Sequence, residues 1–402
     1  MNKKNDNIIN KKDITSLVKD LVSIYSPYFK EQSVMTYVYN WLEKNDIPVE
    51  YHKYQDKKVT KFEGINVIGN IDGGHTGPKV LLNGHLDTVQ ICEGWDTEPT
   101  VPVLKDEKLY GLGALDMKSG VGAMMLALQA FNERYKKFNG SIVYSFVSDE
   151  EGPYGLGTNF LIHDELINDA DVAIVPEPSS GFTGEDFPCL CLGARGGYSY
   201  KVQFKGLSAH AANPDKGVSA IVDASRVVSE LKKLTLKEDS HLGKGDICII
   251  EMKGGGAACS VADQAEFTVF RHIVLGENKE TLKNEVDKAV KNAGIKSDYE
   301  VIFRDAPTPN SDGFLPYLVD EKNKYTQDFI RSVEEITGEK INISYFSSIG
   351  DFNYIGSRLK IPTFVFGPGG EKYHSSNEYV NMDDVLKTSK IIYNYLERLL
   401  VI

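Results

Sequence analysis

The chain has 402 residues, of which 41% are hydrophobic and 25% are charged, which is ordinary for a globular protein. Its formal net charge of −12 argues against nucleic acid or an anionic membrane as the main partner, because both attract basic patches. The length exceeds what a single compact core usually holds, so we expect two domains.

The opening segment, residues 1–17, is polar and lacks the apolar stretch of a signal peptide. No run of eighteen apolar residues follows, so we predict no membrane-spanning helix. The five cysteines are odd in number and scattered, unlike a disulfide framework. These features favour a cytoplasmic protein.

Helical and strand-like patterns alternate along most of the chain. The apolar spacing predicts a helix over 14–24, with Asp13 as its N-cap, and a second helix over 31–44. Strands are expected over 66–71, 79–87, 141–147, 171–177 and 361–367, with further helices over 117–131 and 382–400. This alternation predicts an α/β fold with a mainly parallel sheet and helices on both faces.

The middle of the chain has a different order. We expect strands over 198–205, 246–252, 266–275 and 299–304, and helices over 218–234 and 279–292. The resulting βαββαβ order is that of a ferredoxin-like unit. We therefore predict an inserted domain over 197–305, within a discontinuous domain formed by 1–196 and 306–402.

Residues that can bind metals follow the predicted strands. His85 and Asp87 end one strand, Glu150 and Glu151 follow the next, and Glu177 follows a third. Ligands in parallel sheets bind beyond the carboxyl ends of the strands, so these side chains are expected to meet there. Two adjacent carboxylates repel each other unless a cation neutralises one of them. The pattern suggests a metal centre with a carboxylate base beside it, and hence a hydrolase.

Each of these signals has an ordinary explanation when taken alone. His85 could be a solvent-facing histidine at a strand end, and Glu150 with Glu151 a solvated acidic turn. Asp116 lies in a glycine-rich turn before a helix and could simply cap it, while His374 could be a loop histidine. Only their combination favours a metal site.

That combination resembles one family from about residue 13 to residue 400. The segments that carry the resemblance are NGHLDTV, GLGALDMKSGVGAMM, SDEEGPYGLGT, VPEP, FKGLSAHAANPDKGVSAI and GPGGEKYHSSNEYV. They are similar to the acetylornithine deacetylase / succinyl-diaminopimelate desuccinylase / glutamate carboxypeptidase family of dinuclear zinc hydrolases. The resemblance implies a zinc-peptidase-like catalytic domain and an inserted lid and dimerisation domain.

The resemblance also implies a role for each residue. It implies that His85 and Glu177 bind one zinc ion, that Glu151 and His374 bind the other, and that Asp116 bridges both. Glu150 is the implied general acid and base, and Asp87 orients His85. His210 is expected to reach the active site of the partner subunit in a homodimer and to stabilise the oxyanion there. Co²⁺ or Mn²⁺ could replace the two Zn²⁺.

The segment that should bind the substrate departs from the family pattern. Family members often carry Asn-x-x-Pro and then a strand ending in Asp-x-Arg, whereas Cys259, Ala262 and Phe270 stand near those positions here. The substrate-binding arginine is then either Arg271 or absent, with His272 in its place. Since neighbours on a strand face opposite ways, this choice decides whether a cation points at the substrate. We favour Arg271, and expect Asn213 to contact the substrate as well.

The sequence thus predicts a metal-dependent amidohydrolase that removes the acyl group from an N-acyl amino acid. Glu at position 177 favours deacylases and carboxypeptidases within the family, since aminopeptidases and dipeptidases more often carry Asp there. A metallo-carboxypeptidase or dipeptidase acting on short peptides is the first alternative. A non-catalytic binding protein on the same scaffold is the second, and metal analysis with a hydrolysis screen separates them.

Overall fold

A computed structural model describes residues 8–401, and the chain divides into two compact units. Unit 1 contains the residues up to Ala194 and from Leu318 onward, and unit 2 contains Arg195–Tyr317. The second junction therefore lies after Tyr317, whereas the sequence led us to expect it after position 305. The reason is that residues 306–317 remain attached to unit 2, where Phe314 exchanges two backbone hydrogen bonds of 2.8 Å with Gly197.

Unit 1 is built around a nine-stranded sheet with the order β1-β2-β6-β3-β7-β17-β8-β15, and β16 pairs with β8. The central strands β6, β3, β7 and β17 run parallel, while β1 and β2 are antiparallel additions at one edge. The strand bounds are Glu50–Gln55 (β1), Glu63–Asp72 (β2), Gly74–His85 (β3), Phe138–Val147 (β6), Val172–Val175 (β7), Cys189–Ala194 (β8), Tyr317–Leu318 (β15), Asn342–Phe346 (β16) and Thr363–Val365 (β17). A small antiparallel sheet joins β4 (Val103–Lys105), β5 (Lys108–Tyr110), β18 (Gly370–Glu371) and β19 (Tyr379–Asn381).

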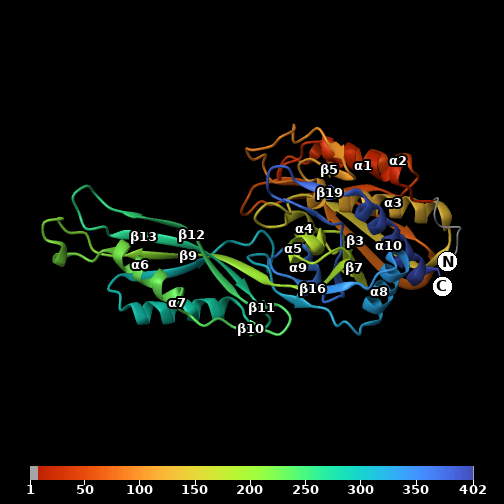
Figure 1. The fold of residues 1–402 in the computed structure, drawn as a ribbon. Coiled ribbons are helices and arrows are strands. Elements are labelled where there is room, and N and C mark those ends of the chain that lie inside the picture. Colours follow the sequence, from red (N-terminus) through yellow and green to blue (C-terminus); the bar gives the residue numbers. More distant parts are fainter. Residues whose placement is uncertain (1–7, 402) are drawn as a thin grey trace. The chain divides into compact units, whose positions relative to one another are not determined.

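Helices cover both faces of the large sheet, as predicted (Figure 1). Their bounds are Lys11–Ser23 (α1), Gln32–Lys44 (α2), Ser119–Arg134 (α3), Leu156–His163 (α4), Ser179–Thr183 (α5), Lys324–Thr337 (α8), Phe352–Tyr354 (α9) and Met382–Leu400 (α10). Two short π-helical segments, Ala114–Lys118 and Ile355–Leu359, adjoin α3 and α9. Helix α3 packs against α1 and α10 as well as the sheet, which is why nearly all of its residues are buried. Among the described helices, none combines the length and the apolar character needed to cross a bilayer.

The start of α1 differs from our expectation. Asn10, not Asp13, is the N-cap, and its side-chain oxygen accepts a hydrogen bond of 3.0 Å from the backbone N–H of Asp13. Asp13 lies in the first turn, where its charge still interacts favourably with the helix dipole.

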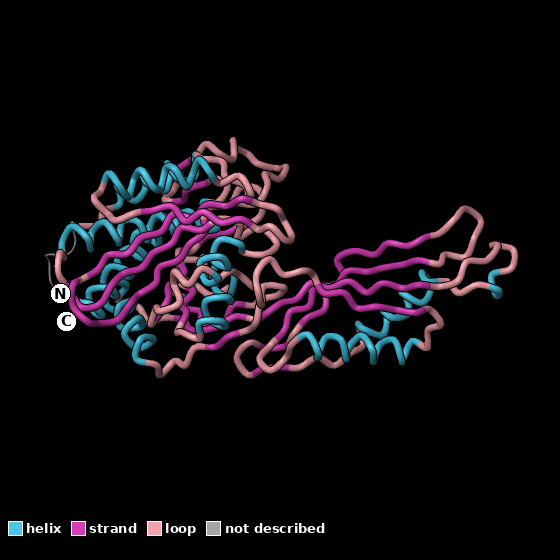
Figure 2. The backbone as a smooth tube through the Cα atoms, turned by 180° about the vertical axis from the view of Figure 1, so that it is seen from behind, coloured by secondary structure: helices cyan, strands magenta, loops and turns pink. Residues whose placement is uncertain are grey.

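Unit 2 has the predicted βαββαβ order. Its elements are β9 (Gly196–Lys205), α6 (Ala220–Leu231), β12 (Asp246–Gly255), β13 (Gln264–Ile273), α7 (Lys279–Ala293) and β14 (Asp298–Phe303), with a short ribbon of β10 (Glu238–Asp239) and β11 (Gly243–Lys244) and a 3-10 turn at Pro214–Lys216. The four long strands form an antiparallel sheet in the order β12-β13-β9-β14. One face of this sheet, which includes Val202, Phe267 and Val269, packs on α6 and α7 and forms the core of the unit. The strands and helices of both units can be followed in Figure 2.

The parallel strands of unit 1 position the candidate site. β3 ends at His85, β6 ends three residues before Glu150, and β7 ends two residues before Glu177. Because neighbouring parallel strands end at the same edge of a sheet, all three segments deliver their side chains to one place.

Candidate metal centre and active site

His85 is the centre of the first cluster of ligand groups. Its side chain is 1% exposed, and its Nε2 atom lies 3.2 Å from Asp116 Oδ1 and 3.3 Å from Glu177 Oε1. Its other ring nitrogen, Nδ1, lies 3.1 Å from the backbone oxygen of Asp87 and 3.5 Å from the Asp87 carboxylate. A hydrogen bond on Nδ1 leaves Nε2 to face the carboxylates, which is the arrangement of a metal-binding histidine.

Asp116 connects this cluster to a second one. One carboxylate oxygen, Oδ1, faces His85, while the other, Oδ2, lies 3.3 Å from His374 Nε2. His374 Nε2 is also 2.8 Å from Glu151 Oε1. The ligand atoms of His85, Asp116 and Glu177 all lie within 4.8 Å of one another, and so do those of Asp116, Glu151 and His374. The two triads share Asp116, as a bridging ligand would.

The carboxylates concentrate negative charge at this point. Burial raises the pKa of Glu177 to about 8 and that of Glu151 to about 7, and Asp116 adds to both shifts. Burial opposes a charge on His374, but its hydrogen bonds with Asp116 and Glu151 hold its pKa at about 11. Burial also favours protonation of Asp116, yet hydrogen bonds from the two histidines keep its pKa below the usual range. The site therefore stabilises positive charge, as protons on histidine or as bound cations.

The donor set fits a pair of divalent ions. Two imidazole nitrogens and three carboxylates are ligands that Zn²⁺ accepts, and Co²⁺ or Mn²⁺ tolerate the same set. Glu177 is 3% exposed, and its Oε2 atom is buried without a hydrogen bond to any described residue. A buried carboxylate oxygen in that position is costly unless a cation contacts it, so the residues fit a metal centre.

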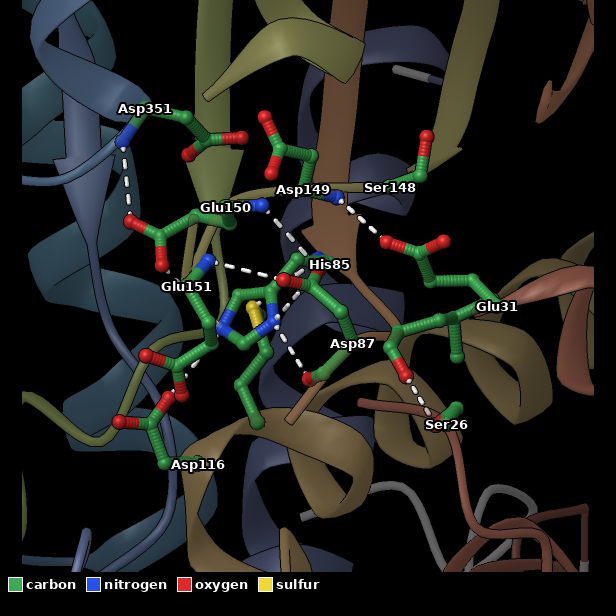
Figure 3. A network of polar contacts seen from close by, with 12 residues as sticks. Ser26, Glu31, His85, Asp87, Asp116, Ser148, Asp149, Glu150, Glu151 and Asp351 are labelled. Atoms are coloured by element: carbon green, nitrogen blue, oxygen red, sulfur yellow. Dashed lines mark hydrogen bonds and ion pairs between the residues drawn. The ribbon is translucent and has the colours of Figure 1, made fainter. Parts of the chain in front are cut away.

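Glu150 lies beside both triads and belongs to neither. Its Oε2 atom is 3.9 Å from His85 Nε2, and its Oε1 atom accepts a hydrogen bond of 3.2 Å from the backbone N–H of Asp351 (Figure 3). Burial raises the pKa of Glu150 well above its usual value, although the charge of His85 opposes that rise. A carboxyl group with a raised pKa close to a metal site is suited to taking up and releasing a proton.

Asp87 anchors the backbone on which Glu150 and Glu151 are carried. Its carboxylate oxygens accept hydrogen bonds of 3.1 Å from Glu150 N and 2.8 Å from Glu151 N (Figure 3). Asp87 thus fixes the acidic loop in addition to approaching His85, and sequence reasoning had foreseen only the second contact. Glu31 holds the same loop one residue earlier, because its Oε1 atom accepts a hydrogen bond of 3.1 Å from Asp149 N.

Asn66 closes the two ends of that acidic loop. Its side-chain oxygen accepts a hydrogen bond of 3.1 Å from Ser148 N, and its side-chain nitrogen donates one of 3.0 Å to the oxygen of Gly157. Ser148 O also accepts a hydrogen bond of 3.0 Å from Gly157 N. A Cβ atom at Gly157 would lie 2.5 Å from Ser148 O and 2.8 Å from Asn66 Oδ1, so only glycine permits this approach.

Glu378 fixes the backbone of the turn that carries Asp116 in a similar way. It is 1% exposed and accepts hydrogen bonds from the backbone N–H groups of Gly113, Leu115 and Asp116, at 2.7–3.0 Å. Sequence reasoning missed Glu378 and Asn66. For Glu378 the available signal was its place four residues after His374 in the last family-like segment, while Asn66 had no signal beyond being polar within a strand.

The predicted site residues of unit 2 lie outside both triads. His210 and Asn213 are exposed in the loop that follows β9. The Nδ1 atom of His210 accepts a hydrogen bond of 3.1 Å from Ala212 N, which fixes the direction of the ring.

Arg271 is placed differently from our expectation. Its side chain is fully buried on the helix-covered face of β13, where its NH2 atom lies 2.7 Å from Glu277 and 2.9 Å from Glu285. These two carboxylates neutralise the guanidinium inside unit 2, which favours a structural role for Arg271 over the substrate contact that we predicted. Its neighbour His272 is half-buried on the opposite face of the sheet.

Known proteins are similar to this chain in both sequence and fold. A profile of Peptidase family M20/M25/M40 matches residues 81–398. A succinyl-diaminopimelate desuccinylase from Sulfurovum sp. (strain NBC37-1) is 26% identical over 318 residues, which cover 78% of this chain and 82% of the relative.

Two solved structures show the same fold at low identity. Aminopeptidase PepT from Bacillus cereus ATCC 10987 superposes with a TM-score of 0.77 at 22% identity, over 98% of this chain and all of that one. A dinuclear metal-binding peptidase of the M20 family from Bacillus subtilis gives a TM-score of 0.68 at 14% identity, over 96% and 97% of the two chains. The resemblance seen in the sequence is confirmed, and the chain belongs to Peptidase family M20/M25/M40, as a hydrolase that acts on amide bonds.

Proposed function

We propose that this enzyme removes the acyl group from an N-acyl amino acid, with Glu150 as general acid and base. The observation that carries the proposal is the pair of triads sharing Asp116, with Glu150 next to both and bound into neither. The relative from Sulfurovum, which is named as a desuccinylase, supports an acyl-amino-acid substrate.

We assign one divalent ion to His85 and Glu177, a second to Glu151 and His374, and Asp116 to both. Zn²⁺ is the proposed metal, with Co²⁺ and Mn²⁺ as substitutes. When bound, such a pair lowers the pKa of water and polarises the scissile carbonyl.

Glu150 then handles the protons. It takes a proton from the attacking water and delivers it to the leaving amine, which needs a carboxyl group that is stable in both forms. Its burial supports this role, because burial destabilises the carboxylate relative to the acid. The hydrogen bond from Asp351 N to Oε1 leaves Oε2 directed to the His85 side of the site.

Unit 2 is proposed to act as a lid and dimerisation domain. His210 would stabilise the oxyanion in the partner subunit, and its exposure is compatible with that reach. Asn213 and His272 are proposed to contact the substrate, His272 taking the place of Arg271 because Arg271 is occupied by Glu277 and Glu285.

A homodimer is supported by the surface of unit 2. Strand β12 lies at an edge of its sheet and exposes Ile250 and Met252, at 57% and 43%. Helix α6 exposes Ile221 and Val222, at 38% and 45%. Exposed apolar residues on an edge strand and its neighbouring helix are typical of a surface that pairs with another chain. Light scattering during gel filtration tests the dimer.

A cytoplasmic location is proposed on the state of the cysteines. All five are free, two of them buried in β8. Reduced cysteines are typical of the cytoplasm, and cell fractionation checks this.

The decisive experiment compares Glu150→Gln with the unchanged enzyme, in hydrolysis and in metal content. We expect hydrolysis of N-acyl amino acids to fall by about 10²–10⁴-fold, the usual contribution of a general acid and base, while two metal equivalents remain bound. Excess chelator should abolish activity in the unchanged enzyme, and Zn²⁺, Co²⁺ or Mn²⁺ should restore it. Glu165→Gln, at an exposed position of unit 1, is the matched control.

Three results would contradict the proposal in different ways. Loss of metal together with activity in Glu150→Gln would make Glu150 a ligand. Full activity in metal-free protein would exclude the mechanism. Preference for dipeptides over N-acyl amino acids in the same screen would replace deacylation by peptidase activity.

A further inference from the structure

A cavity of about 290 Å³ adjoins the two triads within unit 1. One side of it is formed by the ligand groups and Glu150. The other side is formed by Phe182, Phe346, Ser347, Ser348, Ile349, Phe352 and Tyr373. The cavity therefore combines the reacting centre with a largely apolar wall, in a volume at the small end of ligand pockets.

The wall is held in place by contacts between its aromatic rings. Phe182 lies on α5, shortly after Glu177, and its ring centroid is 4.6 Å from that of Phe346 and 4.4 Å from that of Tyr373. Phe346 ends β16 and is 3% exposed, so it is fixed by the core behind it. Tyr373 directly precedes His374. Two segments that adjoin ligand residues, and strand β16, thus place their aromatic rings together beside the site.

The charges of the cavity disfavour an anionic group. No lysine or arginine is among the described residues that line it, whereas four carboxylates are: Asp116, Glu150, Glu151 and Glu177. Two divalent ions would balance the charge of these four carboxylates and leave no excess to hold another one. A second carboxylate on the substrate would have to lose its water against Phe182 and Phe346 without a counter-charge, which is costly.

We infer that this aromatic wall binds a compact apolar group of the substrate, a single ring or a branched aliphatic chain, attached next to the scissile amide. The inference rests on the proposed function and narrows it to substrates with an apolar group on one side of the amide bond. The preferred substrate would then differ from that of the relative named as a desuccinylase, because a succinyl group carries a free carboxylate.

Two substrate series tell which side of the amide bond supplies the group. In the first, glycine carries acetyl, isovaleryl, benzoyl or succinyl groups. In the second, the N-acetyl group is kept and the amino acid is glycine, leucine, phenylalanine or glutamate. We expect kcat/KM for the apolar members of one series to exceed that for its anionic member by about tenfold or more, the usual discrimination of a hydrophobic pocket.

Variants at Phe182 assign this preference to the wall. Phe182→Ala should lower kcat/KM for the preferred apolar substrates by about tenfold relative to that for N-acetylglycine, because the larger apolar group loses its contact with the ring. Phe182→Lys adds the missing cation and should raise the succinyl-to-benzoyl or glutamate-to-phenylalanine ratio, which damage to the fold would not do. Tyr39→Ala removes a half-buried aromatic residue that stacks on Tyr51 away from the cavity, and serves as the control.

The outcomes separate this inference from the proposed function. If the enzyme hydrolyses succinyl or glutamate substrates best, or if both Phe182 variants change all substrates equally, the inference is wrong while amide hydrolysis stands. If no compound is hydrolysed with any of the metals, the proposed function fails and the inference with it.

Discussion

Replacing Asn66 by leucine should impair catalysis although this residue lies outside both triads. Asn66 is fully buried on β2 and joins the two ends of the segment 148–157, which carries Glu150 and Glu151. Leucine has a similar volume but offers neither donor nor acceptor. The substitution therefore removes the bridge without opening a large cavity.

The size of the effect follows from the groups that lose their partner. Ser148 N–H and the Gly157 carbonyl would each lose a hydrogen bond in a buried position, at a cost of about 1–3 kcal/mol per group. The backbone bond between Gly157 N and Ser148 O remains, so we expect distortion of the loop and not its complete release. A displacement of about 1 Å in a catalytic group reduces the rate by about 100-fold, which is the loss of kcat we expect for Asn66→Leu.

Metal content distinguishes misplacement of the loop from general damage. Only Glu151 among the proposed ligands lies on this loop, so the site of Glu151 and His374 should lose affinity while that of His85 and Glu177 keeps its metal. The assay is kcat at saturating metal, combined with metal stoichiometry across a zinc titration and the midpoint of thermal unfolding. Asn70→Leu, on an exposed position of the same strand, is the control.

An Asn66→Leu enzyme that folds and keeps kcat within about twofold would refute this reasoning, since the expected change is far larger. It would mean that the bonds from Glu150 N and Glu151 N to Asp87 suffice to position the loop. Equal loss of both metal equivalents would also count against it, because that result indicates a general loss of structure.

Two further predictions concern unit 2. Arg271→Leu should lower the free energy of unfolding of this unit by about 3–5 kcal/mol, because the buried Glu277 and the partly buried Glu285 would lose their counter-charge, whereas an exchange of all three for apolar residues should cost much less. A denaturant titration measures both, and a single variant as stable as the unchanged chain contradicts the assignment. Burial opposes ionisation of Asp223, but hydrogen bonds from the backbone at Ser297 and its neighbour hold its pKa below the ordinary 3.8. The ionised Asp223 therefore contributes its full stabilisation above pH 3.8, the ordinary pKa, and loses it as pH falls through the lowered pKa of the folded state. Asp223→Asn should accordingly be less stable than the unchanged chain at pH 7, and this difference should disappear in acid. A difference that does not shrink as pH falls through the lowered pKa of Asp223 would show that the charge is irrelevant.

Much of the fold was predictable because the patterns that encode it are local. The βαββαβ order of unit 2 follows from the alternation of short apolar strands with amphipathic helices, and each predicted element is present within a few residues. The ends of β3, β6 and β7 were predictable for the same reason, and with them the convergence of His85 and Glu177 in one triad, with Glu151 in the adjoining one. Residues at the ends of neighbouring parallel strands lie at one edge of the sheet, so their proximity can be predicted without knowing the long-range packing.

The supporting residues were not predictable in this way. Glu378 meets the turn at Asp116 across more than 260 positions, and Asn66 meets Ser148 across 82. Neither residue type nor spacing predicts such a contact, because the sequence does not distinguish a buried glutamate or asparagine from an exposed one. Only the three-dimensional arrangement of the backbone N–H groups that they satisfy gives them a role.

The two candidates for the substrate contact illustrate the limit most clearly. Arg271 and His272 are adjacent on β13, so the pleat of the strand sends one of them to the helix-covered face and the other to the open face. The alternation of Phe267, Val269 and Ile273 places Arg271 on the covered face, a register that the sequence itself contains. Arg271 is the charged member of this otherwise apolar series, and because arginine is usually exposed, we expected its side chain to face solvent or substrate. What makes the buried arginine tolerable is the pair of carboxylates from Glu277 and Glu285, one in the turn before α7 and the other on the helix. The strand pattern therefore had priority over the residue type, and this is why our proposal moves the substrate contact to the face that carries His272.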